Sequence, residues 1–128
     1  MKLYISGPMT GYVDFNRPAF ERAAASLRAA GHECIVPGDG ETYTADEQLR
    51  WRASDENRAT WLHRDFNHIL GSADAVVVLS GWVYSEGARA EVLVAQNAGI
   101  RVLDMNLNPI EEIVLTWVTT KEEQVRVW

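Results

Sequence analysis

The chain has 128 residues, of which 47% are hydrophobic and 23% charged, which is typical of a single globular domain with a substantial core. Eighteen acidic residues against 12 Lys and Arg give a net charge of −6, which argues against a nucleic-acid polymer or an anionic membrane as the main partner. The lone Cys34 excludes an intrachain disulfide, and no apolar run reaches membrane length. Because Lys2 leads directly into a predicted strand, no signal peptide is expected, and the cytoplasm is the expected location.

Residues 2–6 predict a first strand, and a glycine-containing loop follows at its carboxyl end. The loop reads Gly7-Pro8-Met9-Thr10-Gly11-Tyr12. Its two glycines let backbone N–H groups approach a ligand, although a plain tight turn is the alternative for this segment alone. The Walker phosphate-loop pattern is absent.

A helix is predicted next, with Asp14 or Asn16 as its cap and Pro18 in its first turn. Its inward-facing stripe consists of Phe20, Ala23, Ala24 and Leu27, and Gly31 ends it. Residues 33–36 predict a second strand, which Pro37 terminates. Residues 38–57 are polar, and both a lid and a partly helical insertion fit them.

Residues 58–70 predict a helix whose apolar stripe is Leu62, Phe66 and Ile69. Asp65 falls between Trp61 and Ile69 on one helical face. Desolvation there should raise the pKa of Asp65 and prepare it as a proton donor. The alternative is an Asp satisfied by its helix neighbours Arg64 or His68.

The central segment runs from residue 74 to residue 103. The continuous apolar run of residues 75–79 predicts a central parallel strand that is covered on both faces. A loop at 80–84 and a helix from Ser85 follow, with Ala88, Val92, Ala95 and Gly99 as a stripe of small residues. Residues 100–103 predict the next strand, joined by a right-handed crossover.

Ligands of open α/β sheets bind beyond the carboxyl ends of the strands, so Ser85, Gly87 and Glu91 are candidate site residues. Ser85 can cap the helix, whose free N–H groups suit an anion such as phosphate. Gly87 leaves Glu91 uncovered from the N-terminal side. The alternative interpretation of so short a motif is a helix cap, a flexible glycine and a solvated glutamate.

The end of the chain adds a loop at 104–109, a helix opened by Pro109, and a short final strand at 125–128. The predicted fold is therefore a single-domain, doubly wound α/β fold of flavodoxin-like or Rossmann-like type. Its parallel sheet has about five strands, with helices on both faces.

The order and spacing of four motifs resemble those of the nucleoside 2-deoxyribosyltransferase-like superfamily, and in particular a branch of small phage and bacterial proteins. The motifs are residues 3–8, residues 65–69, Ala73-Asp74 and Ser85-x-Gly87-x-x-x-Glu91. The resemblance covers nearly the whole chain, residues 1–128.

This resemblance implies that Glu91 attacks the anomeric carbon of a nucleoside or nucleotide and that Asp65 assists departure of the base. It also implies a substrate pocket formed by Tyr4, Gly7, Pro8, Met9, Thr10, Gly11, Trp82, Ser85, Gly87 and Asn106. The transferases that use free nucleosides usually carry an aspartate where this chain has Ser85. Ser85 is more similar to the hydrolases of deoxynucleoside 5′-monophosphates, although Pro8 stands where those hydrolases carry a phosphate-contacting serine.

The expected activity is N-glycosidic bond cleavage of a (deoxy)nucleoside 5′-monophosphate, by hydrolysis or by base exchange, with no metal and no cofactor. A non-catalytic nucleotide-binding module is one alternative, and an N-riboside hydrolase acting on NAD or a related signalling nucleotide is the other. The resemblance also implies a homodimer or higher homo-oligomer, with Asn106 and Trp128 near the neighbouring subunit, and the host cytoplasm as location if the protein is phage-encoded.

Overall fold

The computed structural model describes residues 1–9, 11–37 and 55–110. Their elements are, in chain order, β1 (Lys2–Ser6), the 3-10 turn η1 (Val13–Asn16), α1 (Arg17–Ala29), β2 (Glu33–Ile35), α3 (Asp55–Ser72), β3 (Ala75–Val78), the 3-10 turn η2 (Trp82–Tyr84), α4 (Glu86–Asn97) and β4 (Arg101–Leu103). The insertion at 38–54 and the final strand predicted at 125–128 lie outside the described residues.

The described strands form one parallel sheet in the order β2-β1-β3-β4. This is the order expected of a flavodoxin-like fold, and it confirms the predicted doubly wound α/β class. The structure describes four strands instead of about five. All four residues of β3 are buried, as the continuous apolar run predicted for a central strand.

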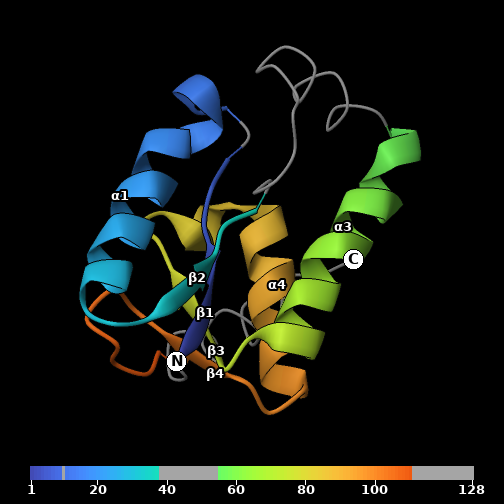
Figure 1. Cartoon of the computed structure of the whole chain (residues 1–128). Coiled ribbons are helices and arrows are strands. Elements are labelled where there is room, and N and C mark those ends of the chain that lie inside the picture. The colour runs from blue at the N-terminus through green and yellow to red at the C-terminus, as the bar shows by residue number, and fades with distance from the viewer. Residues whose placement is uncertain (10, 38–54, 111–128) are drawn as a thin grey trace, which may run out of the picture.

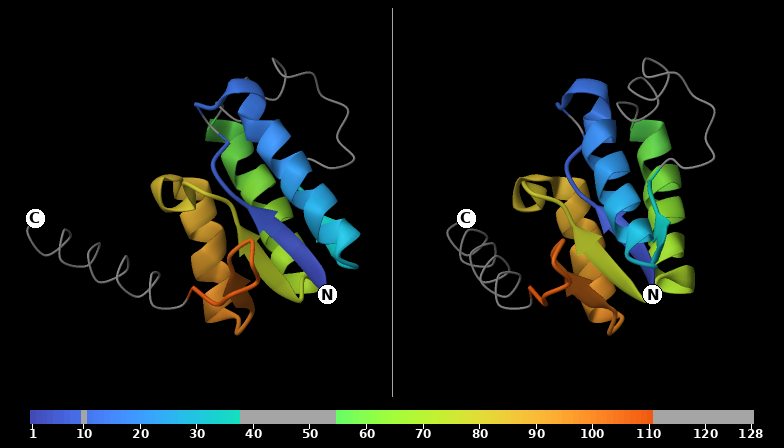
Figure 2. Two further views of the ribbon diagram at one scale, coloured as in Figure 1. Left: turned by 90° about the vertical axis from the view of Figure 1, so that its left-hand side faces the viewer. Right: turned by 60° about the vertical axis from the view of Figure 1, so that its left-hand side comes forward.

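Two separate cores lie on the two faces of the sheet, because successive residues of a strand point to opposite sides. Leu3 and Ile5 of β1 pack with Phe20, Ala24 and Leu27 of α1 on one face, which we call the α1 face. Tyr4, Val76 and Val78 pack with Ile69 of α3 and Val92 of α4 on the other, the α3/α4 face. Figure 1 shows α1 on the left of the strands and α3 and α4 on the right, and Figure 2 turns the side of α1 toward the viewer.

The entry to α1 differs from the predicted cap. Helix α1 begins at Arg17 with Pro18 in its first turn, but no side chain caps it. Three consecutive non-glycine residues, Asp14, Phe15 and Asn16, have φ between 51° and 62°, and Asn16 donates its amide to the Pro8 carbonyl oxygen at 3.0 Å. Such left-handed residues cost about 1–3 kcal/mol each. Asn16 therefore ties the chain to the loop after β1 instead of capping the helix.

The other helix boundaries follow local signals. Ser85 caps α4 as predicted, with its Oγ accepting from the Ala88 N–H at 3.2 Å. Glycines with positive φ, Gly31 and Gly99, follow the ends of α1 and α4. Helix α3 is longer than the predicted 58–70, starting at Asp55 and ending at Ser72.

The segment after β4 differs from the prediction at its start. Pro109 forms an antiparallel bridge with Leu103, and the Ile110 N–H donates to the Val102 carbonyl oxygen at 3.2 Å, so neither residue begins a helix. The rest of the helix predicted after Pro109 lies outside the described residues. The loop before it is held by Asp104, whose Oδ1 accepts from the backbone N–H groups of Asn106 and Asn108. In the described ranges, no helix is long and apolar enough to cross a bilayer.

Candidate active site

Glu91 is a buried carboxylate that two hydroxyl groups of one strand hold in place. It is 6% exposed and projects from the second turn of α4 toward β1. The Tyr4 hydroxyl donates to Oε2 of Glu91, and the Ser6 hydroxyl donates to Oε1 at 3.1 Å. Hydrogen bonds to an ionised acceptor are the stronger kind, so the two hydroxyls offset part of the desolvation penalty of this carboxylate.

The geometry of β1 explains why both hydroxyls reach the same carboxylate. Tyr4 and Ser6 are two residues apart on a strand, so both face α4, and both are fully buried. The Leu79 N–H donates to the Ser6 carbonyl oxygen at 2.8 Å, which continues the β1–β3 ladder to the carboxyl end of β1. Gly7 is required there, because a Cβ at this position would lie 2.8 Å from Cβ of Leu79.

The second acidic residue of the site is Asp65 on α3. It is 8% exposed, as its place between Trp61 and Ile69 predicted. Both helices run antiparallel to the strands and so parallel to each other, and a Cβ at Gly87 would lie 4.0 Å from the Trp61 ring. Asp65 follows Trp61 by one turn of α3, and Glu91 follows Gly87 by one turn of α4, so we expect the two carboxyl groups at similar levels along the two helices.

The N-terminus of α4 lies one turn before Glu91. Ser85 Oγ already accepts a backbone hydrogen bond as the helix cap, which leaves its O–H proton to donate to a ligand oxygen. The first N–H groups of a helix also favour anions, so this end suits a phosphate. Gly87 contributes no side chain between this end and Trp61.

The remaining predicted substrate-binding residues occupy different surroundings. Gly7 and Pro8 are buried at the carboxyl end of β1, Gly11 is exposed, and Thr10 lies outside the described residues. Trp82 is 7% exposed and packs in the core of the α3/α4 face. Asn106 is exposed in the loop after β4, at the end of the sheet where the carboxyl ends of the other strands also lie.

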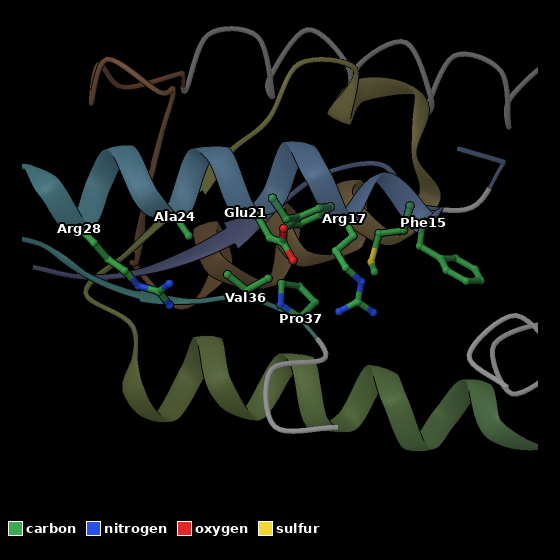
Figure 3. Close-up of a pocket in the computed structure, with 9 residues that line it drawn as sticks. Phe15, Arg17, Glu21, Ala24, Arg28, Val36 and Pro37 are labelled. Atoms are coloured by element: carbon green, nitrogen blue, oxygen red, sulfur yellow. The ribbon is translucent and has the colours of Figure 1, made fainter. Parts of the chain in front are cut away.

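A surface pocket of about 110 Å³ opens on the α1 face, on the opposite side of β1 from Glu91. Figure 3 shows Arg17, Glu21 and Arg28 projecting from α1 beside Val36 and Pro37. Of the predicted site residues, Met9 lines this pocket. Across residues 1–9, 11–37 and 55–110, no three His, Cys, Asp or Glu side chains gather as a metal site.

Ser6 is the site residue that the sequence-based prediction missed. A polar residue at the carboxyl end of an otherwise apolar buried strand, two positions after Tyr4, is the signal that could have revealed it. Its partner Glu91 is 85 residues away in the chain, so no local motif connects the two.

Comparison of the whole chain with curated proteins and with solved structures found no match. Comparison with protein families found one described as "Domain of unknown function (DUF4406)", which matches residues 1–104 and so includes every described strand together with Glu91 and Asp65. The chain belongs to this family.

Proposed function

We propose that this protein cleaves the N-glycosidic bond of a deoxynucleoside 5′-monophosphate, with Glu91 as the nucleophile. The observation that carries the proposal is the burial of Glu91 with one hydroxyl donor on each carboxylate oxygen. A solvated surface glutamate needs no such support, and a buried carboxylate lowers folding stability unless it is well compensated. The fold therefore tolerates a loss of stability in order to hold one carboxylate near the carboxyl ends of β1 and β3, where ligands of such sheets bind.

The reaction fits the chemistry of the two buried acids. Cleavage passes through an oxocarbenium-like transition state, which a carboxylate oxygen stabilises and then captures by forming a bond to C1′. The C1′–N bond breaks with its electron pair passing to the base, and a protonated Asp65 supplies the proton. Water then attacks C1′, its proton returns to Asp65, and the electron pair of the ester bond returns to Glu91.

The motif resemblance to the nucleoside 2-deoxyribosyltransferase-like superfamily supports the same assignment. Ser85 in place of an aspartate favours hydrolysis of a phosphorylated substrate over base exchange between free nucleosides. The N-terminus of α4, with the Ser85 hydroxyl beside it, offers the phosphate a place one turn from Glu91. Assembly as a homo-oligomer, with the exposed Asn106 loop near a neighbouring subunit, is part of the same proposal.

The test is release of free base from a panel of nucleosides, their 5′-monophosphates and NAD, followed by chromatography. We expect base from one or more deoxynucleoside 5′-monophosphates, and the Glu91→Gln variant should lose at least about 1,000-fold in turnover. Glu33→Gln is the matched control, since Glu33 is exposed at the start of β2 at the opposite end of the sheet. It should retain wild-type rates.

Each of the other outcomes would indicate a different function. Base released from NAD alone would indicate an N-riboside hydrolase of another substrate class. Nucleotide binding measured by calorimetry without base release would indicate a non-catalytic binding module. Full activity of Glu91→Gln would exclude the nucleophile assignment whichever substrate reacts.

A further inference from the structure

Ser6 donates the weaker of the two hydrogen bonds that Glu91 accepts from hydroxyl groups of β1. Tyr4 donates to Oε2 through a phenolic O–H, which is a stronger acid than an aliphatic hydroxyl and therefore the better donor. Ser6 donates to Oε1 at 3.1 Å, slightly longer than the usual O–H···O hydrogen bond. The two carboxylate oxygens are therefore held unequally.

The backbone around Ser6 allows its hydroxyl little freedom of position. Ser6 is fully buried, its Cα pairs with Val78 of β3, and the Leu79 N–H binds its carbonyl oxygen. Gly7, the next residue, packs against Leu79 so closely that it leaves no room for a Cβ. Ser6 is the last residue of β1, at the carboxyl end of the sheet where ligands of such sheets bind. Oε1, which accepts its hydrogen bond, is therefore the carboxylate oxygen closer to that end.

We propose that Ser6 is a positioning residue for Glu91: it fixes the carboxylate in the resting site and is the partner exchanged when Oε1 bonds to a sugar carbon. This inference rests on the proposed function for its kinetic consequence. When Oε1 becomes an ester oxygen it accepts hydrogen bonds poorly, so the Ser6 hydroxyl is released beside the new C1′–O bond. Tyr4 keeps its bond to Oε2, which becomes the ester carbonyl oxygen.

The first experiment does not depend on turnover. Glutamate is labelled with ¹³C at the side-chain carboxyl carbon, the Glu91 signal is assigned with Glu91→Gln, and its titration is followed by NMR in wild type and in Ser6→Ala. Loss of a donor to the charged form should raise the pKa of Glu91 by about one unit, a tenfold change in proton affinity. The other ionisable residues of the site, Tyr4 of β1, which donates to Oε2, and Asp65 of α3, are identical in the two proteins.

Ser26→Ala is the matched control, because it makes the same chemical change at an exposed position of α1, on the opposite face of the sheet from Glu91. It should leave the Glu91 titration unchanged. If Ser6→Ala folds poorly, Ser6→Cys keeps a side chain of similar size with a weaker donor and should give a smaller shift of the same sign. A Glu91 titration that neither Ser6 variant alters would overturn the proposal.

The second experiment separates positioning from substrate contact. On whichever substrate the base-release panel identifies, Ser6→Ala should lower kcat about tenfold and leave KM within about twofold. A rise in KM at unchanged kcat would overturn the proposal, because it would make Ser6 a substrate contact. If wild type releases no base from any compound, the proposed function fails, and the NMR titration alone still decides whether Ser6 holds Glu91.

Discussion

The two faces of the sheet bury different kinds of side chain. On the α1 face the core is apolar, and the charged groups Arg17, Glu21 and Arg28 stay at the rim of an open pocket. On the α3/α4 face lie all the polar or charged side chains that are buried within the described ranges, which are Ser6, Asp65 and Glu91. Strand β1 contributes to both faces, because its residues alternate: Leu3 and Ile5 pack on the α1 face, and Tyr4 and Ser6 face α4. This division fits the proposed function, in which the α3/α4 face carries the chemistry and the α1 face contributes only to stability.

The largest expected loss of stability is on the α1 face. Phe20 is 2% exposed between α1 and β1, so Phe20→Ala should lower the free energy of unfolding by about 3–5 kcal/mol, measured by urea denaturation. Turnover per folded molecule should stay near wild type at low temperature. Val13→Ala is the control, because Val13 is 93% exposed and should lose almost nothing. If fully folded Phe20→Ala lost much of its turnover, the assignment of stability to the α1 face and activity to the α3/α4 face would be wrong.

The reverse behaviour is expected of Asp65 on the α3/α4 face. Asp65→Asn should lower turnover about 100-fold, because the base loses its proton donor, while the free energy of unfolding changes by less than about 1 kcal/mol. The rate loss should be greatest for bases that leave poorly. Comparison of substrates with good and poor leaving groups checks this, and an equal loss on all of them would argue against proton donation.

Asp14→Asn is the matched control for Asp65→Asn. Asp14 is exposed in the turn before α1, and Asn tolerates the left-handed conformation that this position adopts. The control should therefore preserve both turnover and stability. Loss of turnover in this variant would mean that the charge of the whole protein, and not the buried carboxylate, governs the rate.

The sequence predicted the features that depend on local pattern. The apolar run at 75–79 predicted the central buried strand, and Ser85 before a helical pattern predicted the cap of α4. The burial of Asp65 followed from its place between two large apolar residues of one helix. In each case the signal and the structure lie within one element, so periodicity and capping preferences suffice.

The features that were missed depend on contacts between distant segments. The bond from Ser6 to Glu91 joins β1 to α4, and no spacing within either element indicates it. The left-handed turn at 14–16 includes Phe15, for which a positive φ is unfavourable, and Asp or Asn before a helical pattern favours a side-chain cap instead. Pro109 pairs with Leu103 because the chain folds back on β4, although Pro is also a common first residue of a helix.

The smallest expected effect is at Asn16, where the α1 side of the molecule meets the loop after β1. Asn16→Gly removes the amide donor to Pro8 but tolerates a φ of 62°, so it should lower the free energy of unfolding by about 1 kcal/mol. Asn16→Ala removes the same bond and adds the cost of a left-handed alanine, so its loss should be about 2 kcal/mol. Urea denaturation of both variants measures the difference. Because only Ala disfavours positive φ, equal losses would show that the backbone at residue 16 does not hold the left-handed conformation that joins the two regions.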